Sequence, residues 1–431
     1  MRPFRTCLLG LVAGLLLGAT PAAAASEMPR SAAAFRDSVG VTTHIVYYDT
    51  AYGDWPRVVQ RLEELGVRHL RDGVYGNPAP QWRDWNERYY RAVELAASRG
   101  MRFAFGMGQP GNRSGSLDEL VGVVGGRLRH AAEALEAPNE FDLFVGGPGW
   151  ADALRSYTRE LYSTVDRHPS LRRLPVLGPS LYGADAPRSV GDQRSSLDVG
   201  NIHPYTGGKS PGPAHVRSEL ARAATVSGPK PVWATEAGFH NALKSTAGQP
   251  PTSERAAAVY HVRTFLEHFK SGIARTYAYE LLDDKPEPGR RDPEQHFGLL
   301  RNDFSPKPAF TALRNLLAAV GEDHDGRERL RPLRLSVSGG SAVRRLVLQR
   351  ADGSHVVALW RHASVWDREA RRSQCVAPLS VTVGLPGAAR VTVADPVDGE
   401  KRRLSLRGGR ARVQLGGSPL LLEVGGRSRT R

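Results

Sequence analysis

The stretch Leu135-Glu136-Ala137-Pro138-Asn139-Glu140 decides the fold that we predict for this chain. A short apolar approach, residues 131–135, ends there in a polar Asn-Glu pair. Ninety-six residues after Glu140, a second apolar run, residues 231–235, ends in Glu236. Barrel enzymes gather their functional side chains where parallel strands end, at one face of the barrel. The two glutamates would therefore meet there, and two facing carboxylates are the minimum set for cleaving a glycosidic bond.

The segments around these glutamates alternate between short apolar runs and longer runs with helical spacing of apolar residues. The expected strands are residues 39–47, 66–71, 101–106, 131–135, 174–178, 197–202, 231–235 and 274–279. The expected helices are residues 55–65, 82–98, 117–128, 150–168, 214–225, 253–270 and 307–320, with a weak candidate after the fifth strand. Eight such units predict an α/β fold, a (β/α)₈ TIM barrel over residues 39–320. The alternative, an open doubly wound sheet, lacks a Gly-x-Gly-x-x-Gly turn after the first strand.

The pattern changes beyond a charged, glycine-containing linker at residues 321–331. Short β-type runs follow at residues 333–337, 342–348, 355–360, 379–383, 390–394, 402–406, 411–415 and 420–424. Gly-Gly, Asp-Gly and Pro-Gly turns separate them, which predicts a small antiparallel β-sandwich over residues 332–425. Residues 26–38 form a lead-in to the barrel, and residues 426–431 form a basic tail.

The first 25 residues have the pattern of a secretory signal peptide. Arg2 and Arg5 form a basic region, residues 8–17 an apolar core, and residues 23–25 a cleavage signature of three alanines. The apolar core is too short to span a bilayer comfortably, and no later stretch is long and apolar enough. The sequence therefore predicts a secreted protein with no membrane insertion.

The composition limits the class of partner. The chain has 59 basic and 44 acidic residues and a net charge of +15. The arginines are scattered rather than gathered in one block, which favours general surface charge and disfavours nucleic acid. Anionic cell-wall polymers or an acidic polysaccharide are the alternative partners of a basic exported protein. The exported chain keeps a single cysteine, Cys375, so we expect a large core in place of disulfides, with Cys375 as a small buried side chain. We expect a monomer.

The two strand ends, Pro138-Asn139-Glu140 and Thr235-Glu236, together resemble clan A of the glycoside hydrolases, the 4/7 superfamily. The resemblance covers residues 39–320 and is nearest to family 39 and the cellulase-like family 5 members, where a trailing sandwich is also common. It implies that Glu140 is the acid/base and Glu236 the nucleophile of a retaining hydrolase. A β-linked polysaccharide or oligosaccharide outside the cell is the implied substrate.

The chemistry also follows from the residues themselves. Retaining hydrolysis needs one carboxyl that protonates the leaving oxygen and a second, about 5–5.5 Å away, that stays ionised and attacks the anomeric carbon. Asn139, beside Glu140, suits a hydrogen bond to the sugar 2-hydroxyl, a contact that strengthens in the transition state. The alternative is that neither residue takes part in chemistry: Glu140 caps a helix and Glu236 is a solvated loop residue.

Three further residues support this interpretation through the resemblance. Tyr205 follows the sixth strand, where its counterpart in clan A bonds the nucleophile, and His203 would line the sugar site. Arg71 ends the second strand and resembles the clan arginine that pairs with the nucleophile. The alternatives are a packed histidine, a surface tyrosine and a salt bridge away from the site.

Strand eight departs from the clan pattern, because Tyr279-Glu280 stands where many members have a tryptophan that stacks on the sugar. Tyr279 or Glu280 is expected to take over that contact, and Glu280 is also a rival carboxylate. His44 after the first strand is a further candidate sugar contact. Other polar loop residues expected at the same face are Gln109, Asn112, His240 and Asn241. Trp233, inside strand seven, is expected to be core.

We expect no cofactor and no metal. The sequence has no His-Glu-x-x-His motif and no Cys/His cluster, and Asp283, Asp284 and Asp292 lack EF-hand spacing and are interpreted as solvated acids. A transglycosylase with the same glutamates is the nearest alternative function, followed by a glycan-binding barrel without catalysis. The sandwich could bind glycan through Trp360 and Trp366, but a structural role is favoured.

Overall fold

The computed structural model of the protein describes residues 24–109, 114–321 and 329–425. The basic tail, Asn112, most of the predicted linker and nearly all of the predicted signal peptide lie outside these ranges. Export and the cleavage site therefore stay predictions. Within the described ranges, no helix has both the length and the apolar character needed to cross a membrane.

Eight parallel strands form the barrel that the sequence predicts. They are β3 (Val39–Thr42), β4 (His69–Gly73), β5 (Arg102–Gly106), β6 (Ala132–Glu136), β7 (Val176–Leu177), β8 (Gly200–Ile202), β9 (Val232–Ala237) and β10 (Arg275–Ala278). The order in the sheet is β7-β6-β5-β4-β3-β10-β9-β8. A parallel bridge between Leu177 and Val199 joins the two outer strands, so the sheet closes.

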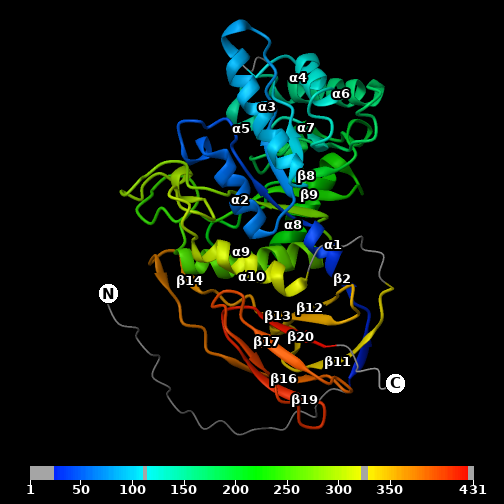
Figure 1. The fold of residues 1–431 in the computed structure, drawn as a ribbon, viewed down its shortest axis with the longest axis vertical. Coiled ribbons are helices and arrows are strands. Elements are labelled where there is room, and N and C mark those ends of the chain that lie inside the picture. Colours follow the sequence, from blue (N-terminus) through cyan, green and yellow to red (C-terminus); the bar gives the residue numbers. More distant parts are fainter. Residues whose placement is uncertain (1–23, 110–113, 322–328, 426–431) are drawn as a thin grey trace.

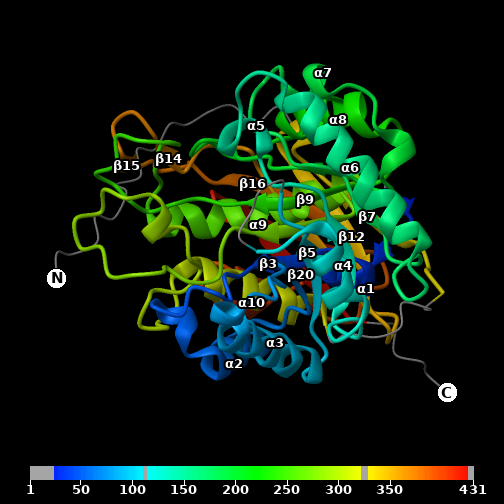
Figure 2. The same cartoon turned by 90° about the horizontal axis from the view of Figure 1, so that it is seen from above.

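Helices surround this barrel (Figure 2). They are α2 (Trp55–Leu65), α3 (Arg83–Ser98), α4 (Leu117–Gly125), α6 (Trp150–Arg167), α7 (Ala186–Val190), α8 (Pro213–Ser227), α9 (Glu254–Ser271) and α10 (Pro308–Val320), with α1 (Ala32–Asp37) before β3 and α5 (Phe141–Phe144) after β6. Short 3₁₀ turns lie at Ala51–Gly53, Pro80–Trp82, Arg194–Ser196, Glu294–His296 and Gly340–Ala342. The fifth strand keeps only two residues, and its helix α7 is short, as the weak pattern there suggested.

The barrel interior is filled by side chains. Trp233, Tyr277, Leu177, Val199 and two alanines pack there, which confirms Trp233 as core. At the amino-terminal end of the barrel, Glu133 accepts a hydrogen bond from Tyr277 (3.0 Å) and faces Arg275 (3.1 Å). Such contacts at this end hold neighbouring strands together, whereas the opposite end is free for chemistry.

A β-sandwich follows the barrel (Figure 1). One sheet has the order β1-β11-β16-β19 and the other β18-β17-β20-β13-β12-β2. Its strands are β1 (Ala25–Glu27), β2 (Arg30–Ser31), β11 (Leu333–Val337), β12 (Arg344–Gln349), β13 (His355–Trp360), β16 (Leu379–Gly384), β17 (Val391–Ala394), β18 (Lys401–Arg403), β19 (Arg410–Leu415) and β20 (Leu420–Val424), and a separate hairpin joins β14 (Trp366–Asp367) to β15 (Arg372–Ser373). Because β1 and β2 pair with β11 and β12, part of the expected lead-in belongs to these sheets.

Helix α9 lies between barrel and sandwich (Figure 1). Every residue from 256 to 269 is buried, including charged ones. Glu267, at 0% exposure, accepts hydrogen bonds from Arg344 (2.6 Å) and the Trp360 indole (3.2 Å). The Trp366 indole donates to the Pro251 carbonyl (2.8 Å). Both tryptophans therefore connect the two parts, in line with a structural role.

Two expectations from the sequence are wrong. Cys375 is exposed rather than buried, because it lies in an irregular exposed segment after β15. Asp283 and Asp284 are buried rather than solvated, since the loop after β10 folds inward and Asp283 pairs with Lys307 (2.7 Å). Burial raises the pKa of Asp284 to about 7, and the neighbouring Glu280 adds to the shift.

Candidate active site

The two glutamates that organise the sequence share one histidine. Glu140 follows β6 and Glu236 lies within β9. His203, just after β8, places its Nδ1 atom 2.7 Å from Glu140 Oε1 and 3.5 Å from Glu236 Oε2. One donor atom from each of the three side chains lies within 4.8 Å of the others. The three strands thus bring two carboxylates together at the carboxyl-terminal face.

The backbone of Glu140 turns its side chain toward the barrel axis. Its φ of 40° and ψ of 46° are left-handed values that cost a non-glycine residue about 1–2 kcal/mol. Its N–H donates to Ser180 Oγ (3.2 Å), which lies just after β7. The Glu140 carboxylate bonds His203 and makes no capping bond to α5, so the helix-cap alternative does not describe it. Strain held by neighbouring contacts is typical of functional positions.

Glu236 is buried and held from both sides. Arg71 Nη1 donates to Glu236 Oε1, and the Tyr205 hydroxyl donates to Oε2 (2.7 Å). Burial alone would raise the pKa of Glu236, but the charges of His203 and Arg71 and the bond from Tyr205 together lower it below the usual value. Glu236 is therefore an ionised carboxylate at neutral pH, as a nucleophile requires.

A polar network under the site fixes Arg71. Glu136, at 0% exposure, accepts from Arg71 Nε (2.8 Å), Arg71 Nη2 (3.0 Å) and Asn201 Nδ2 (2.9 Å). Thr235 Oγ1 lies 2.8 Å from Asn201 Oδ1 and 3.0 Å from His203 Nε2. Glu136 and Asn201 were not predicted to have a role. The available signals were a carboxylate at the end of an apolar run and an amide inside a short strand.

Asn139 also belongs to this network. Its Oδ1 accepts from Arg71 Nη2 (2.7 Å). Because arginine is only a donor, this contact fixes the amide orientation and leaves Nδ2 to donate elsewhere. A donor beside Glu140 is what the predicted contact with a sugar hydroxyl needs.

The residues from strand eight and His44 form a second cluster. Glu280, at 1% exposure, faces His44 Nε2 (3.0 Å) and accepts from the Tyr52 hydroxyl (3.3 Å). Burial raises the pKa of Glu280 well above the usual value, and Glu294 and Asp283 add to the shift. The raised pKa makes Glu280 a poorer candidate for an ionised nucleophile than Glu236, whose pKa is lowered.

Tyr279 and the remaining candidate sugar contacts have different surroundings. The Tyr279 ring packs near Tyr205 (6.3 Å between centroids) and its hydroxyl donates to Glu294 (3.0 Å). His240 and Asn241 are buried and bond the carbonyls of Gln249 and Thr252, so they hold their loop. Gln109 lines an open hollow over the ends of β3 to β6.

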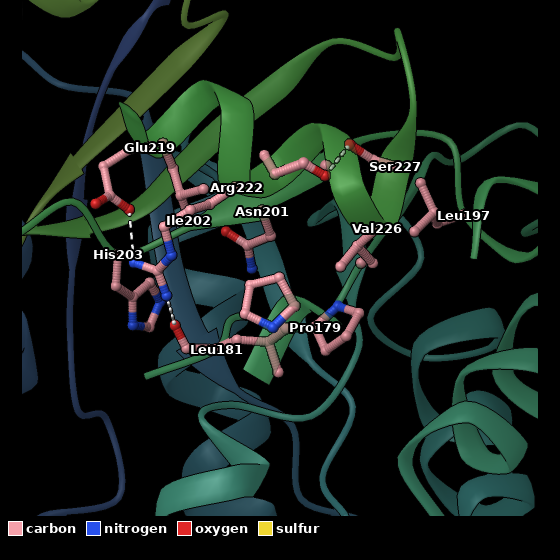
Figure 3. Close-up of a pocket in the computed structure, with 14 residues that line it drawn as sticks. Pro179, Leu181, Leu197, Asn201, Ile202, His203, Glu219, Arg222, Val226 and Ser227 are labelled. Atoms are coloured by element: carbon pink, nitrogen blue, oxygen red, sulfur yellow. Dashed lines mark hydrogen bonds and ion pairs between the residues drawn. The ribbon is translucent and has the colours of Figure 1, made fainter. Parts of the chain in front are cut away.

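Two hollows adjoin the carboxylates. The open hollow is lined by polar groups that include His44, Arg71, Asp72, Gln109 and Asn139. The second is a narrow cavity behind His203, between β8, α8 and residues 178–181 (Figure 3). There Arg222 bonds Glu219 (3.0 Å). Neither Glu140 nor Glu236 is among the residues that line either hollow. The cavity has a volume of about 20 Å³, enough for about one water molecule, whereas the open hollow has about 190 Å³ and is the more suitable place for a sugar.

The described residues contain one trio with donor atoms near metal-ligand spacing, namely Glu140, His203 and Glu236. Arg71 and Tyr205 already bond the two oxygens of Glu236, and a cation would have to displace them. The oxygens of Glu236 therefore suit the arginine that they already bond better than an additional metal ion.

Comparison with known proteins finds similarity in structure. No protein-family model matches the sequence, and no curated protein matches it. A family 39 glycoside hydrolase from the gut symbiont Bacteroides cellulosilyticus WH2 is similar with a TM-score of 0.62 at 16% identity, over 91% of this chain and 82% of that chain. The family 39 enzyme from Xanthomonas axonopodis pv. citri gives a TM-score of 0.56 at 14% identity, over 94% and 98%. A monomeric β-xylosidase from Caulobacter crescentus CB15 gives 0.55 at 13%, over 93% and 97%.

The chain has the fold of these glycoside hydrolases. Because the likeness extends over more than nine-tenths of this chain, it includes the sandwich as well as the barrel. At such low identities it shows the fold alone, so the activity has to be argued from the site.

Proposed function

We propose that this chain is a retaining glycoside hydrolase that cleaves β-glycosidic bonds of a polysaccharide or oligosaccharide. Glu140 acts as acid/base and Glu236 as nucleophile, within a catalytic barrel formed by residues 39–320. The signal-like pattern of residues 1–25 supports export, so the substrate is an extracellular or cell-wall glycan.

The contact of both carboxylates with His203 carries this proposal. The distances of 2.7 Å and 3.5 Å from Nδ1 keep the two groups close enough for direct attack on one sugar. Retaining enzymes separate their carboxyl groups by about 5–5.5 Å, whereas inverting enzymes leave about 6.5–9.5 Å for a water molecule. The donor atoms here, all within 4.8 Å, support the retaining case.

The proposed reaction has two steps. In the first, a Glu236 oxygen bonds the anomeric carbon while the bond to the leaving oxygen breaks, and the proton of Glu140 moves to that oxygen. In the second, Glu140 takes a proton from water, the water oxygen attacks the anomeric carbon, and Glu236 leaves. An oxygen and a nitrogen 2.7 Å apart share a proton, so the His203 contact keeps one within reach of Glu140.

The surrounding residues have supporting roles in this proposal. Arg71 and Tyr205 orient Glu236 and keep it charged. Asn139 donates to the sugar 2-hydroxyl, and His44, Tyr279 and Glu280 line the sugar site from strands one and eight. Glu136 and Asn201 position Arg71 without touching the substrate.

The test is turnover of a panel of activated aryl β-glycosides and soluble β-glycans. We expect Glu236→Ala to lose activity by about 10⁴-fold or more, and azide to restore part of it with inverted product. Glu140→Ala should lose about 10²–10⁴-fold on poor leaving groups and much less on activated ones. Product analysis of the wild type separates hydrolysis from transfer to a second sugar.

Glu87→Ala serves as the matched control, because Glu87 lies on the exposed face of α3 and pairs only with surface arginines. It should keep full activity. Activity that survives both active-site substitutions would overturn the assignment and turn attention to Glu280.

A further inference from the structure

An exposed apolar surface lies beside Glu140. Leu143, Phe144 and Val145 are 48%, 64% and 47% exposed, and Tyr182 is 63% exposed. We call these four residues the apolar rim. In the described ranges, two other large hydrophobic side chains, Met28 and Tyr47, are exposed to a comparable degree. A run of three consecutive exposed apolar residues is unfavourable unless it has a function.

The rim is held in a fixed place next to the site. The N–H groups of Leu143 (2.8 Å) and Phe144 (3.0 Å) both donate to the carbonyl of Glu140. Phe141 is buried between α6, α7 and α8 and anchors the short helix. With a rise of about 1.5 Å per residue, Phe144 lies roughly 6 Å along the helix from Glu140.

Asp142 fastens Tyr182 to the same helix. Its two carboxylate oxygens accept from the backbone N–H groups of Tyr182 (3.1 Å) and Gly183 (2.7 Å). The loop after β7 is tied again where Ser180 accepts from the Glu140 N–H. Sandwich strands do not cover these residues, since α5 lies on the side of the barrel away from the sandwich (Figure 1).

The direction of the proposed reaction says which part of a substrate meets the rim. Glu140 protonates the leaving oxygen, so the leaving group lies on the Glu140 side of the broken bond. The sugar that becomes attached to Glu236 lies on the other side, near Arg71 and Asn139. An extension of the leaving group beyond Glu140 runs toward α5, which begins at the next residue, and toward Tyr182, which Asp142 holds against α5.

We propose that the apolar rim binds an apolar leaving group, an alkyl or aryl aglycone, and that the substrates include glycosides of this kind. This inference rests on the proposed function. Three of the four rim side chains have no polar atom, and Leu143 and Val145 offer no flat face on which a sugar ring stacks. Self-association through the rim is disfavoured by the net charge of +15, which makes copies repel.

The experiment compares methyl, butyl and octyl β-glycosides of the sugar that the aryl panel selects, each below its micelle concentration. Alkyl alcohols are similarly poor leaving groups, so chain length changes binding and not the chemical step. Burying one methylene favours binding by up to about fourfold. We expect kcat/KM to rise at least about tenfold from methyl to octyl in the wild type, and the octyl-to-methyl ratio to fall by about tenfold in Phe144→Ser/Tyr182→Ser.

Met28→Ser is the matched control, because Met28 is 62% exposed but lies near the sandwich between β1 and β2. It should leave the ratio unchanged. A wild type that turns over the glycosides without any dependence on chain length, or a double variant that keeps the ratio, would overturn the inference alone.

Three further results would also overturn it. A disaccharide whose turnover depends on the rim more than the octyl glycoside does would assign the rim to a sugar. A wild type that elutes as a dimer while the double variant elutes as a monomer would assign it to a second copy. Failure to cleave any aryl glycoside, alkyl glycoside or soluble β-glycan would overturn the proposed function and this inference together.

Discussion

Each oxygen of Glu236 has a hydrogen-bond donor of its own, and these two donors help to lower the pKa of Glu236. Arg71 bonds one oxygen and the Tyr205 hydroxyl the other at 2.7 Å. Tyr205 is the easier donor to remove without leaving a buried charge, because it is neutral. Burial raises the Tyr205 pKa well above its usual value, and the charge of Glu236 adds to the shift. It therefore stays a donor throughout the working pH range.

The first prediction is that Tyr205→Phe moves the acidic limb of the pH–rate profile upward. Glu236 has a lowered pKa, and the nucleophile proposed above must be ionised. Activity is therefore lost as pH falls through that pKa. Removing the tyrosine bond raises the pKa, so activity is lost at a higher pH. A hydrogen bond to a charged group contributes about 1.5–3 kcal/mol, which corresponds to roughly one to two pH units. The measurement is kcat/KM against pH.

Tyr279→Phe provides the comparison, since its hydroxyl bonds Glu294 and not Glu236. Its acidic limb should stay close to that of the wild type. Equal displacement in both variants would mean that the limb reports another group.

At this scale the sequence predicts polar residues near the carboxyl-terminal face of the barrel, but not all of their partners. Glu140 and Tyr205 follow β6 and β8, and Arg71 lies two residues before the end of β4, near the face where the barrel topology brings side chains together. Glu136 was missed because its side chain points into the barrel from an apolar run, and periodicity alone cannot distinguish a buried ion partner from an exposed residue. The raised pKa of Glu280 also depends on burial and on the neighbouring acids Glu294 and Asp283, which follow from the folding of the loop after β10.

At the scale of elements, β9 and the segment after β10 pass very close to each other beside the site. A Cβ atom on Gly238 would lie 2.1 Å from the carbonyl oxygen of Tyr279 and 3.3 Å from the Phe297 ring. Backbone cannot move aside as a flexible side chain can. Gly238 therefore sets the distance between Glu236, two residues earlier, and the strand-eight residues.

The second prediction is that Gly238→Ala damages both folding and activity. Overpacking should lower the free energy of unfolding by about 1–3 kcal/mol. The forced shift at the end of β9 should lower kcat/KM by about 100-fold, since a displacement of 1 Å at a reacting group costs this much. Denaturant unfolding and turnover of an aryl glycoside measure the two effects.

Gly122→Ala is the opposite case in the same chain. Gly122 lies in helix α4 with nothing within 4 Å of an added Cβ. Alanine there should stabilise the protein by about 0.5–1 kcal/mol and leave activity unchanged. Equal effects at the two glycines would contradict the role given to Gly238.

Elements with strong periodicity were predictable from the sequence, and those defined by partners were not. The eight barrel strands and long helices such as α6 and α9 appear where apolar spacing predicts them. Strands β1 and β2 have three and two residues, too few for any period, and exist because β11 and β12 offer free edges. The left-handed backbone of Glu140 depends in the same way on contacts with Ser180 and α5.

For the whole molecule, α9 makes barrel and sandwich one structural unit. A helix on the outside of a barrel normally keeps one polar face in water. In α9 the second face is covered by the sandwich, and it carries groups with partners there. Arg263 bonds the carbonyl of Ala363 (2.8 Å), and Glu267 bonds Arg344 and Trp360.

The last prediction is that the barrel does not fold stably without the sandwich. Ending the chain after Val320 would expose the outer face of α9, leave Glu267 without its partners Arg344 and Trp360, and remove the strands with which β1 and β2 pair. Loss of a partner from a buried ion pair alone costs about 3–5 kcal/mol, a large part of the stability of a typical domain. We expect the shortened chain to aggregate or to lack near-ultraviolet circular dichroism. A chain that ends after Gly425 keeps every strand of both sheets and should retain the wild-type unfolding transition.

In the full chain, far-ultraviolet dichroism and tryptophan fluorescence should report one coincident unfolding transition, because Trp360 and Trp366 lie at the interface between barrel and sandwich. Two separated transitions, or a soluble and active barrel, would show that the two parts are independent and that the burial of α9 is not needed for the fold.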